Sequence, residues 1–218
     1  PPCRAFNSLF RISVSRMDPK QVSQILAEGK MHMDFCIALY RMQADAGRFF
    51  LHEHPLGASS WKLPGFISLM QREDVYKVRG DMCAHNMIIR DPQGPALAFK
   101  PTEWTSNSKH ILKQLNKLCT NSGSNSDHRH ASLQGGRAAK AAVYPEKLCL
   151  AILRGLRKEL VSKGVMFIGQ IGIICEIIFS SCAQVRNFLF LIFFIFYGRH
   201  TKIAIRIFCL KLIRLNIA

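Results

Sequence analysis

Helix-like and strand-like segments alternate along most of this chain of 218 residues. Asp18-Pro19 is typical of a helix start, because an acidic N-cap and a proline at the first helical position both suit the free N–H groups there. Apolar residues at helical spacing continue to Gly47, which is typical of a helix end. Further helices are predicted from Asn107-Ser108 and from Pro145, and strands at 48–54, 75–83 and 96–100. This alternation favours an α/β sheet with flanking helices.

The composition changes abruptly after Gly164, which predicts two units. Residues 1–164 form the expected α/β domain, and residues 165–218 form a basic tail dominated by Ile and Phe. The wholly apolar stretch 188–197 is shorter than the roughly 20 residues that a membrane-spanning helix needs. We therefore favour translated non-coding sequence for the tail. The alternative is a marginal membrane segment within 173–197 that anchors a small basic protein.

The charge of the chain points to an anionic partner. Lys and Arg number 30 against 14 Asp and Glu, so the formal net charge is +16. Such a balance favours nucleic acid or an anionic membrane face. We expect DNA as the partner of an intracellular protein, in the nucleus if DNA binding is retained, with the membrane as the alternative location. Basic residues that could contact phosphates, or simply form a solvated face, are Lys100, Lys109, Lys113, Lys117, Arg129 and Arg137.

The eight cysteines show no C-x-x-C pair and no regular spacing, so we expect reduced thiols rather than a disulfide scaffold. Cys119, His128 and His130 could bind zinc, with Cys83 or His85 as a fourth ligand. Their spacing matches no standard zinc finger, and the segment between them is polar. The preferred interpretation is a solvated loop, and zinc is not expected.

The chain begins with Pro1-Pro2-Cys3-Arg4-Ala5-Phe6, where two prolines hold a cysteine on a stiff, non-helical segment. A thiol presented in this way is accessible to a substrate. Arg4 could lower its pKa and so increase the thiolate fraction. The alternative is that Cys3 is an ordinary loop cysteine.

Segment 1–6 resembles the nucleophile loop Pro-Pro-Cys-x-x-Phe-Ser of DNA cytosine-5 methyltransferases. Segment 51–55, Leu-His-Glu-His-Pro, is similar to the strand that ends in the Glu-Asn-Val/Pro motif of that family. Segment 99–107 is similar to a Lys-Pro-Thr…Trp-Thr-Asn stretch of phage-type homologues. Segments 119–136 and 141–152 resemble divergent copies in polyproteins of eukaryotic mobile elements. Together the resemblance covers roughly residues 1–160.

The resemblance implies a partial Rossmann-like methyltransferase sheet with flanking helices. It also implies a reaction in which the Cys3 thiolate attacks C6 of a flipped cytosine and Glu53 holds N3. The methyl donor in this family is S-adenosylmethionine. Glu53 would lie at a strand end, where ligand crevices of α/β sheets form, although it could equally be a plain charged residue. The residues expected to contact nucleic acid are Arg4, Lys100, Thr102 and Asn107.

Several departures from the family pattern argue against activity. Asn7 stands where the family has serine, and His54-Pro55 follows Glu53 in place of Asn-Val. The glycine-rich loop that holds the cofactor lies upstream of the cysteine in this family, and this sequence has none there. We therefore expect a degenerate, inactive remnant from a mobile element that does not hold S-adenosylmethionine but retains nucleic-acid binding.

Alternation along the strand 48–54 fixes which side chains can act together. His52 and His54 should share one face, and Glu53 should take the other. Neither histidine is therefore expected to join Glu53 in a pocket. Trp61 and Trp104 are expected to pack in the core or at its edge rather than to stack on bases.

Overall fold

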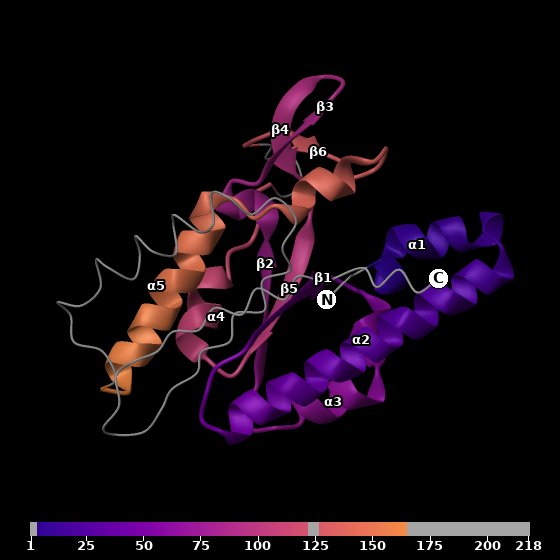
Figure 1. Ribbon diagram of the computed structural model, residues 1–218. Helices are drawn as coiled ribbons and strands as arrows, with labels where there is room; N and C mark the ends of the chain where they lie inside the picture. Colours follow the sequence, from indigo (N-terminus) through magenta and orange to yellow (C-terminus); the bar gives the residue numbers. More distant parts are fainter. Residues whose placement is uncertain (1–3, 122–126, 165–218) are drawn as a thin grey trace, which may run out of the picture.

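The computed structural model describes residues 4–121 and 127–164 (Figure 1). Cys3 and the apolar segment 165–218 lie outside the described residues, so the expectations for the nucleophile and the tail remain predictions. Among the helices that the structure describes, none is both long enough and apolar enough to cross a membrane.

The described chain is a mixed α/β structure, as the sequence predicted. Its α-helices are α1 (Ser8–Ser13), α2 (Pro19–Asp45), α3 (Pro64–Met70), α4 (Lys109–Leu115) and α5 (Glu146–Ser162). Its strands are β1 (Leu51–Pro55), β2 (Tyr76–Asp81), β3 (Ile88–Asp91), β4 (Gly94–Ala98), β5 (Pro101–Ser106) and β6 (His130–Ala131). Short 3-10 turns are η1 (Arg4–Phe6), η2 (Val14–Arg16), η3 (Ser59–Lys62), η4 (Met82–His85) and η5 (Arg137–Ala142).

The predicted helix starts are confirmed by their caps. The Asp18 carboxylate accepts from the N–H of Lys20 at 3.0 Å, and Pro19 is the first residue of α2. The Ser108 hydroxyl accepts from the N–H of Ile111 at 3.2 Å and so caps α4. These contacts satisfy N–H groups that have no partner inside the helix.

The strands form two small sheets. The first has the order β1-β5-β2, and β5 runs antiparallel to both neighbours. It follows that β1 and β2 are parallel to each other, with α3 in the connection between them. The second sheet has the order β3-β4-β6, in which β4 pairs antiparallel with β3 and parallel with β6.

Two hydrophobic cores lie on opposite faces of the first sheet. Trp104 of β5 is fully buried in the core that α4 and α5 cover. The other core lies under α2 and α3 and includes Tyr40 and Phe66. Figure 1 shows the two helix pairs on either side of the sheet. Trp104 is thus a packing residue, as expected, and Trp61 packs against the second core.

All three predicted strands have different bounds in the structure. The strand predicted at 75–83 is β2, which ends at Asp81, and Cys83 lies in η4. The strand predicted at 48–54 begins only at Leu51, because the backbone at Arg48 and Phe50 is hydrogen-bonded to the side chain of Asn107. The strand predicted at 96–100 ends at Ala98. Lys100 therefore lies in the short connection between β4 and β5. No strand was predicted for β5, whose residues belong to the motif 99–107.

Candidate metal centre

Four potential metal ligands converge from three separate parts of the fold. Cys83 lies in η4, directly after β2, and Cys119 follows α4. His128 lies just before β6, and His130 is the first residue of that strand. Both histidines lie close to Cys83 and Cys119, at the end of the first sheet. The Asn86 residue that ends η4 has φ of 63°, a left-handed conformation that asparagine tolerates better than most residues.

The ligand atoms of these four residues all lie within 4.8 Å of one another. The Cys119 Sγ is 3.6 Å from His128 Nε2 and 3.5 Å from His130 Nε2. Tetrahedral zinc with bonds of about 2.3 Å to sulfur and about 2.05 Å to nitrogen places sulfur and nitrogen ligands about 3.6 Å apart. The two Nε2 atoms are 2.9 Å apart, somewhat closer than the roughly 3.3 Å of such a tetrahedron. A small outward shift of one imidazole would bring the two histidines to this spacing.

The electrostatics of the cluster suit a cation at its centre. Burial, followed by contact with Cys119, raises the pKa of the Cys83 thiol to about 12. Burial and the neighbouring His128 lower the pKa of His130, which keeps this imidazole neutral. Neutral imidazoles are the form that binds metal, and a divalent cation would supply the positive charge that two adjacent thiolates require.

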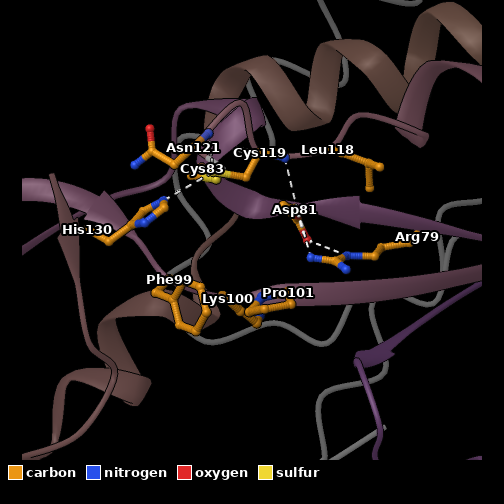
Figure 2. A pocket seen from close by; sticks show the side chains of 10 residues that line it. All are labelled: Arg79, Asp81, Cys83, Phe99, Lys100, Pro101, Leu118, Cys119, Asn121 and His130. Carbon is orange, nitrogen blue, oxygen red and sulfur yellow. Dashed lines mark hydrogen bonds and ion pairs between the residues drawn. The ribbon is translucent and has the colours of Figure 1, made fainter. Parts of the chain in front are cut away.

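A buried carboxylate supports the cluster from behind. Asp81, at the end of β2, pairs with Arg79 through two contacts, Nε to Oδ1 at 3.0 Å and Nη2 to Oδ2 at 3.1 Å. The same carboxylate accepts from the backbone N–H of Cys119 at 2.9 Å, so it fixes this ligand relative to β2. Figure 2 shows both interactions beneath the two sulfur atoms.

Asn121 connects the segment of Cys119 to the segment of His128 by hydrogen bonds. Its backbone N–H donates to Cys119 Sγ at 3.4 Å, and its side-chain amide donates to the carbonyl of His128 at 2.6 Å. Its side-chain oxygen accepts from the N–H of Asp127 at 2.8 Å. Such contacts orient the ligands of a metal site before the metal arrives.

A half-open pocket of about 310 Å³ borders the cluster (Figure 2). It lies where β2 ends and β5 begins, the type of sheet edge at which α/β proteins bind ligands. Its lining residues are Arg79, Asp81, Cys83, Phe99, Lys100, Pro101, Leu118, Cys119, Asn121 and His130.

The structure selects one of the two fourth ligands that the sequence left open. Cys83 faces Cys119, His128 and His130. His85 points elsewhere, because it is buried and its Nε2 lies 3.5 Å from the carbonyl of Leu115. The sequence analysis missed Asp81 and Asn121. An acid two residues before a cysteine and an asparagine two residues after one were the available signals, and both are weak.

Glu53 and Lys100, two of the residues singled out from the sequence, lie together. Lys100 Nζ is 3.4 Å from Glu53 Oε1, and the hydroxyl of Tyr144 donates to Glu53 Oε2 at 3.2 Å. Burial and the Glu53 carboxylate raise the pKa of Tyr144 well above its usual value, so this phenol stays protonated. Tyr144 was not singled out from the sequence, although it lies within the segment 141–152.

The other residues expected to contact nucleic acid differ in their surroundings. Arg4 is exposed in η1. Thr102 is fully buried and donates to the carbonyl of Lys100 at 3.1 Å, so a phosphate cannot reach it. Asn107 uses its side chain to bind the backbone of Arg48 and Phe50, as described above. Thr102 and Asn107 therefore stabilise the fold, and their side chains are not available to a ligand.

His52 and His54 share one face of β1, as predicted, and Glu53 faces the other side. Both histidines are fully buried among aromatic rings, including those of Trp61 and Phe66. The Nδ1 of His52 is 3.0 Å from the hydroxyl of Tyr40, and the Nδ1 of His54 contacts the hydroxyl of Ser60. These two histidines belong to the core and not to the pocket.

Acidification is expected to destabilise the chain through His54. Burial lowers its pKa to about 4, whereas an imidazole in an unfolded chain titrates near 6.5. The unfolded state therefore binds more protons between these values, so this contribution to stability is complete above about pH 6.5 and is lost progressively as the pH falls from there through about 4. In urea unfolding at pH 7 and pH 5, the wild type should lose more stability than His54→Gln. Equal losses would contradict this assignment.

Comparison with protein-family models, with curated proteins and with solved structures finds no match to this chain. The function must therefore be argued from the geometry of the described residues.

Proposed function

We propose that this chain is a zinc-binding α/β domain in which Cys83, Cys119, His128 and His130 hold one Zn²⁺. The observation that carries the proposal is the convergence of the four ligand atoms within 4.8 Å, with sulfur–nitrogen distances of 3.5 and 3.6 Å. Two thiolates and two imidazoles form a ligand set that selects zinc over the harder divalent cations. This proposal replaces the expectation that zinc is absent.

The centre is assigned a structural role. Four protein ligands complete a tetrahedral coordination sphere and leave no open position for water or substrate. The ligands belong to η4, to the segment after α4 and to the entry of β6. The ion would therefore hold the small sheet β3-β4-β6 against the end of the first sheet, where the β4–β6 pairing is only two residues long.

Metal analysis of the purified full chain tests this proposal. We expect about one zinc ion per chain, and Co²⁺ substitution should give the absorption of a tetrahedral site with thiolate ligands. Cys83→Ala should weaken the sulfur-to-cobalt band, whereas the neighbouring His85→Gln should leave it unchanged. Absence of stoichiometric zinc, or the same loss from both variants, would overturn the ligand assignment.

A second candidate function is that of a methyltransferase-like remnant that retains nucleic-acid binding. It is favoured by the packing of the segment just after Cys3 against the carboxyl end of β1. The Ser59 hydroxyl donates to the carbonyl of Phe6 at 3.4 Å, and the Phe6 and His54 rings lie 6.2 Å apart. The nucleophile segment and the Glu53 strand are thus neighbours, although Phe6 lies on the face opposite Glu53.

The sheet itself adds no support to this second candidate. Doubly wound sheets carry an antiparallel strand at the edge of an otherwise parallel sheet, whereas β5 is the central strand here and runs antiparallel to both β1 and β2. We assign no S-adenosylmethionine site to the chain and expect no methyl transfer. Binding to DNA should weaken steeply as salt rises. Methyl transfer to DNA by the purified chain would contradict inactivity, and an absence of DNA binding at low salt would contradict the retained affinity.

A further inference from the structure

We infer that the pocket beside the metal centre binds single-stranded nucleic acid, with one unpaired base stacked on Phe99. This inference rests on the nucleic-acid binding proposed above and names the surface and the form of nucleic acid. Thr102 and Asn107 are not part of this site, because their side chains are hydrogen-bonded within the fold. Its elements are a rigid exposed aromatic ring, an apolar side chain nearby and cationic groups around the pocket.

Phe99 is exposed and held in place. The residue is 58% exposed, a large fraction for a phenylalanine in the short connection between β4 and β5. Its backbone N–H donates to the carbonyl of Ala131 at 3.0 Å, which fixes the residue to β6. Its ring is tilted by 58° against that of His130, with centroids 5.4 Å apart. Because His130 is also a proposed zinc ligand, the metal centre would restrict the ring of Phe99 further.

A second apolar side chain lines the same pocket. Leu118 is 55% exposed and contributes to the lining together with Phe99. Figure 2 shows these two side chains at separate places around the pocket, with Asp81 between them. The pocket volume of about 310 Å³ leaves room for a single nucleobase. An unstacked base presents both its π-face and its edges, so this site favours single strands.

Cationic groups are available around the pocket for the sugar–phosphate backbone. The Arg79 side chain is 47% exposed and binds Asp81 through its Nε and Nη2, while its Nη1 has no hydrogen-bond partner among the described residues. Lys117, directly before Leu118, is exposed. The whole chain carries a formal charge of +16, which attracts a polyanion from a distance. Charge therefore favours a nucleic acid over a neutral ligand for this pocket.

Binding of labelled single-stranded and duplex oligonucleotides to the zinc-loaded full chain tests the inference. Stacking on an aromatic side chain is worth about 1–3 kcal/mol per base, so Phe99→Ala should weaken single-strand binding by about 5- to 150-fold. Phe99→Trp should retain the affinity, and Phe99→Leu, which keeps apolar bulk but no π-face, should lose most of it. Phe35→Ala on α2, where the phenylalanine is 52% exposed, is the matched control and should have no effect.

The outcomes separate this inference from the proposals on which it depends. Zinc content measured for each variant distinguishes a lost base contact from a lost metal centre. If no oligonucleotide binds at low salt, the nucleic-acid function and this inference both fail. If single strands and duplexes bind equally well, or if Phe99→Leu binds like the wild type with its zinc intact, only the stacking site is overturned.

Discussion

Cys119→Ser is expected to abolish stoichiometric zinc binding and to lower the free energy of unfolding by about 4 kcal/mol or more, the range typical of losing a bound structural metal. Cys119 is the ligand whose sulfur lies closest to both histidines, at 3.5 and 3.6 Å. A serine hydroxyl is not ionised at neutral pH and binds zinc poorly. For a domain of this size the loss corresponds to a decrease in Tm of about 8–16 °C.

A chelator provides the control for Cys119→Ser. The wild-type chain should lose a similar amount of stability when zinc is removed, and Cys119→Ser should respond to the chelator no further. Cys36→Ser replaces a buried cysteine of α2, away from the cluster, and should remain sensitive to the chelator even if it is itself less stable. If thermal unfolding of the wild type is the same with and without chelator, the centre has no structural role.

The sequence predicted the fold best where the signal is local. The start of α2 depends on Asp18 and Pro19, and the start of α4 depends on Ser108, so neighbouring residues determine both. The mixed α/β class followed from the same local patterns. The strand β5 was missed because Pro101–Ser106 is rich in polar residues and pairs with partners far away in the sequence, in β1 and β2. No local pattern specifies that pairing.

The candidate site shows the same limit of local reasoning. Cys119, His128 and His130 are near one another in the sequence and could be grouped, but Cys83 lies far upstream. The hydrogen bonds from the Cys119 N–H to Asp81 and from the Asp81 N–H to the carbonyl of Lys117 help to hold the two cysteine segments side by side. The sequence spacing of Cys119, His128 and His130 matches no standard zinc finger, and zinc was therefore not expected. The sequence also does not reveal that Thr102 is buried or that the Asn107 side chain binds the backbone of Arg48 and Phe50.

Gly155→Ala is expected to destabilise the chain by about 3 kcal/mol, at the upper end of the usual cost of overpacking. The intrinsic helix preference has the opposite sign, since alanine is favoured over glycine by about 1 kcal/mol inside a helix. A Cβ at this position of α5 would lie 2.5 Å from the Cα of Ile111 and 2.9 Å from the carbonyl oxygen of His110. These are backbone atoms of α4, so no side-chain rotation can relieve the overlap.

Urea unfolding of Gly155→Ala beside Gly65→Ala measures this packing effect against a matched substitution. Gly65 lies in α3, where the nearest atom to an added Cβ is the Ile37 Cδ1 at 3.3 Å, the end of a side chain that can move. Gly65→Ala should therefore change the stability little. Movement of α4 away from α5 would open the core around Ile111 and Leu115, both buried between this helix and the sheet. A Gly155→Ala chain as stable as the wild type would show that the helices can separate at low cost, and the close α4–α5 contact would then not limit the stability of this core.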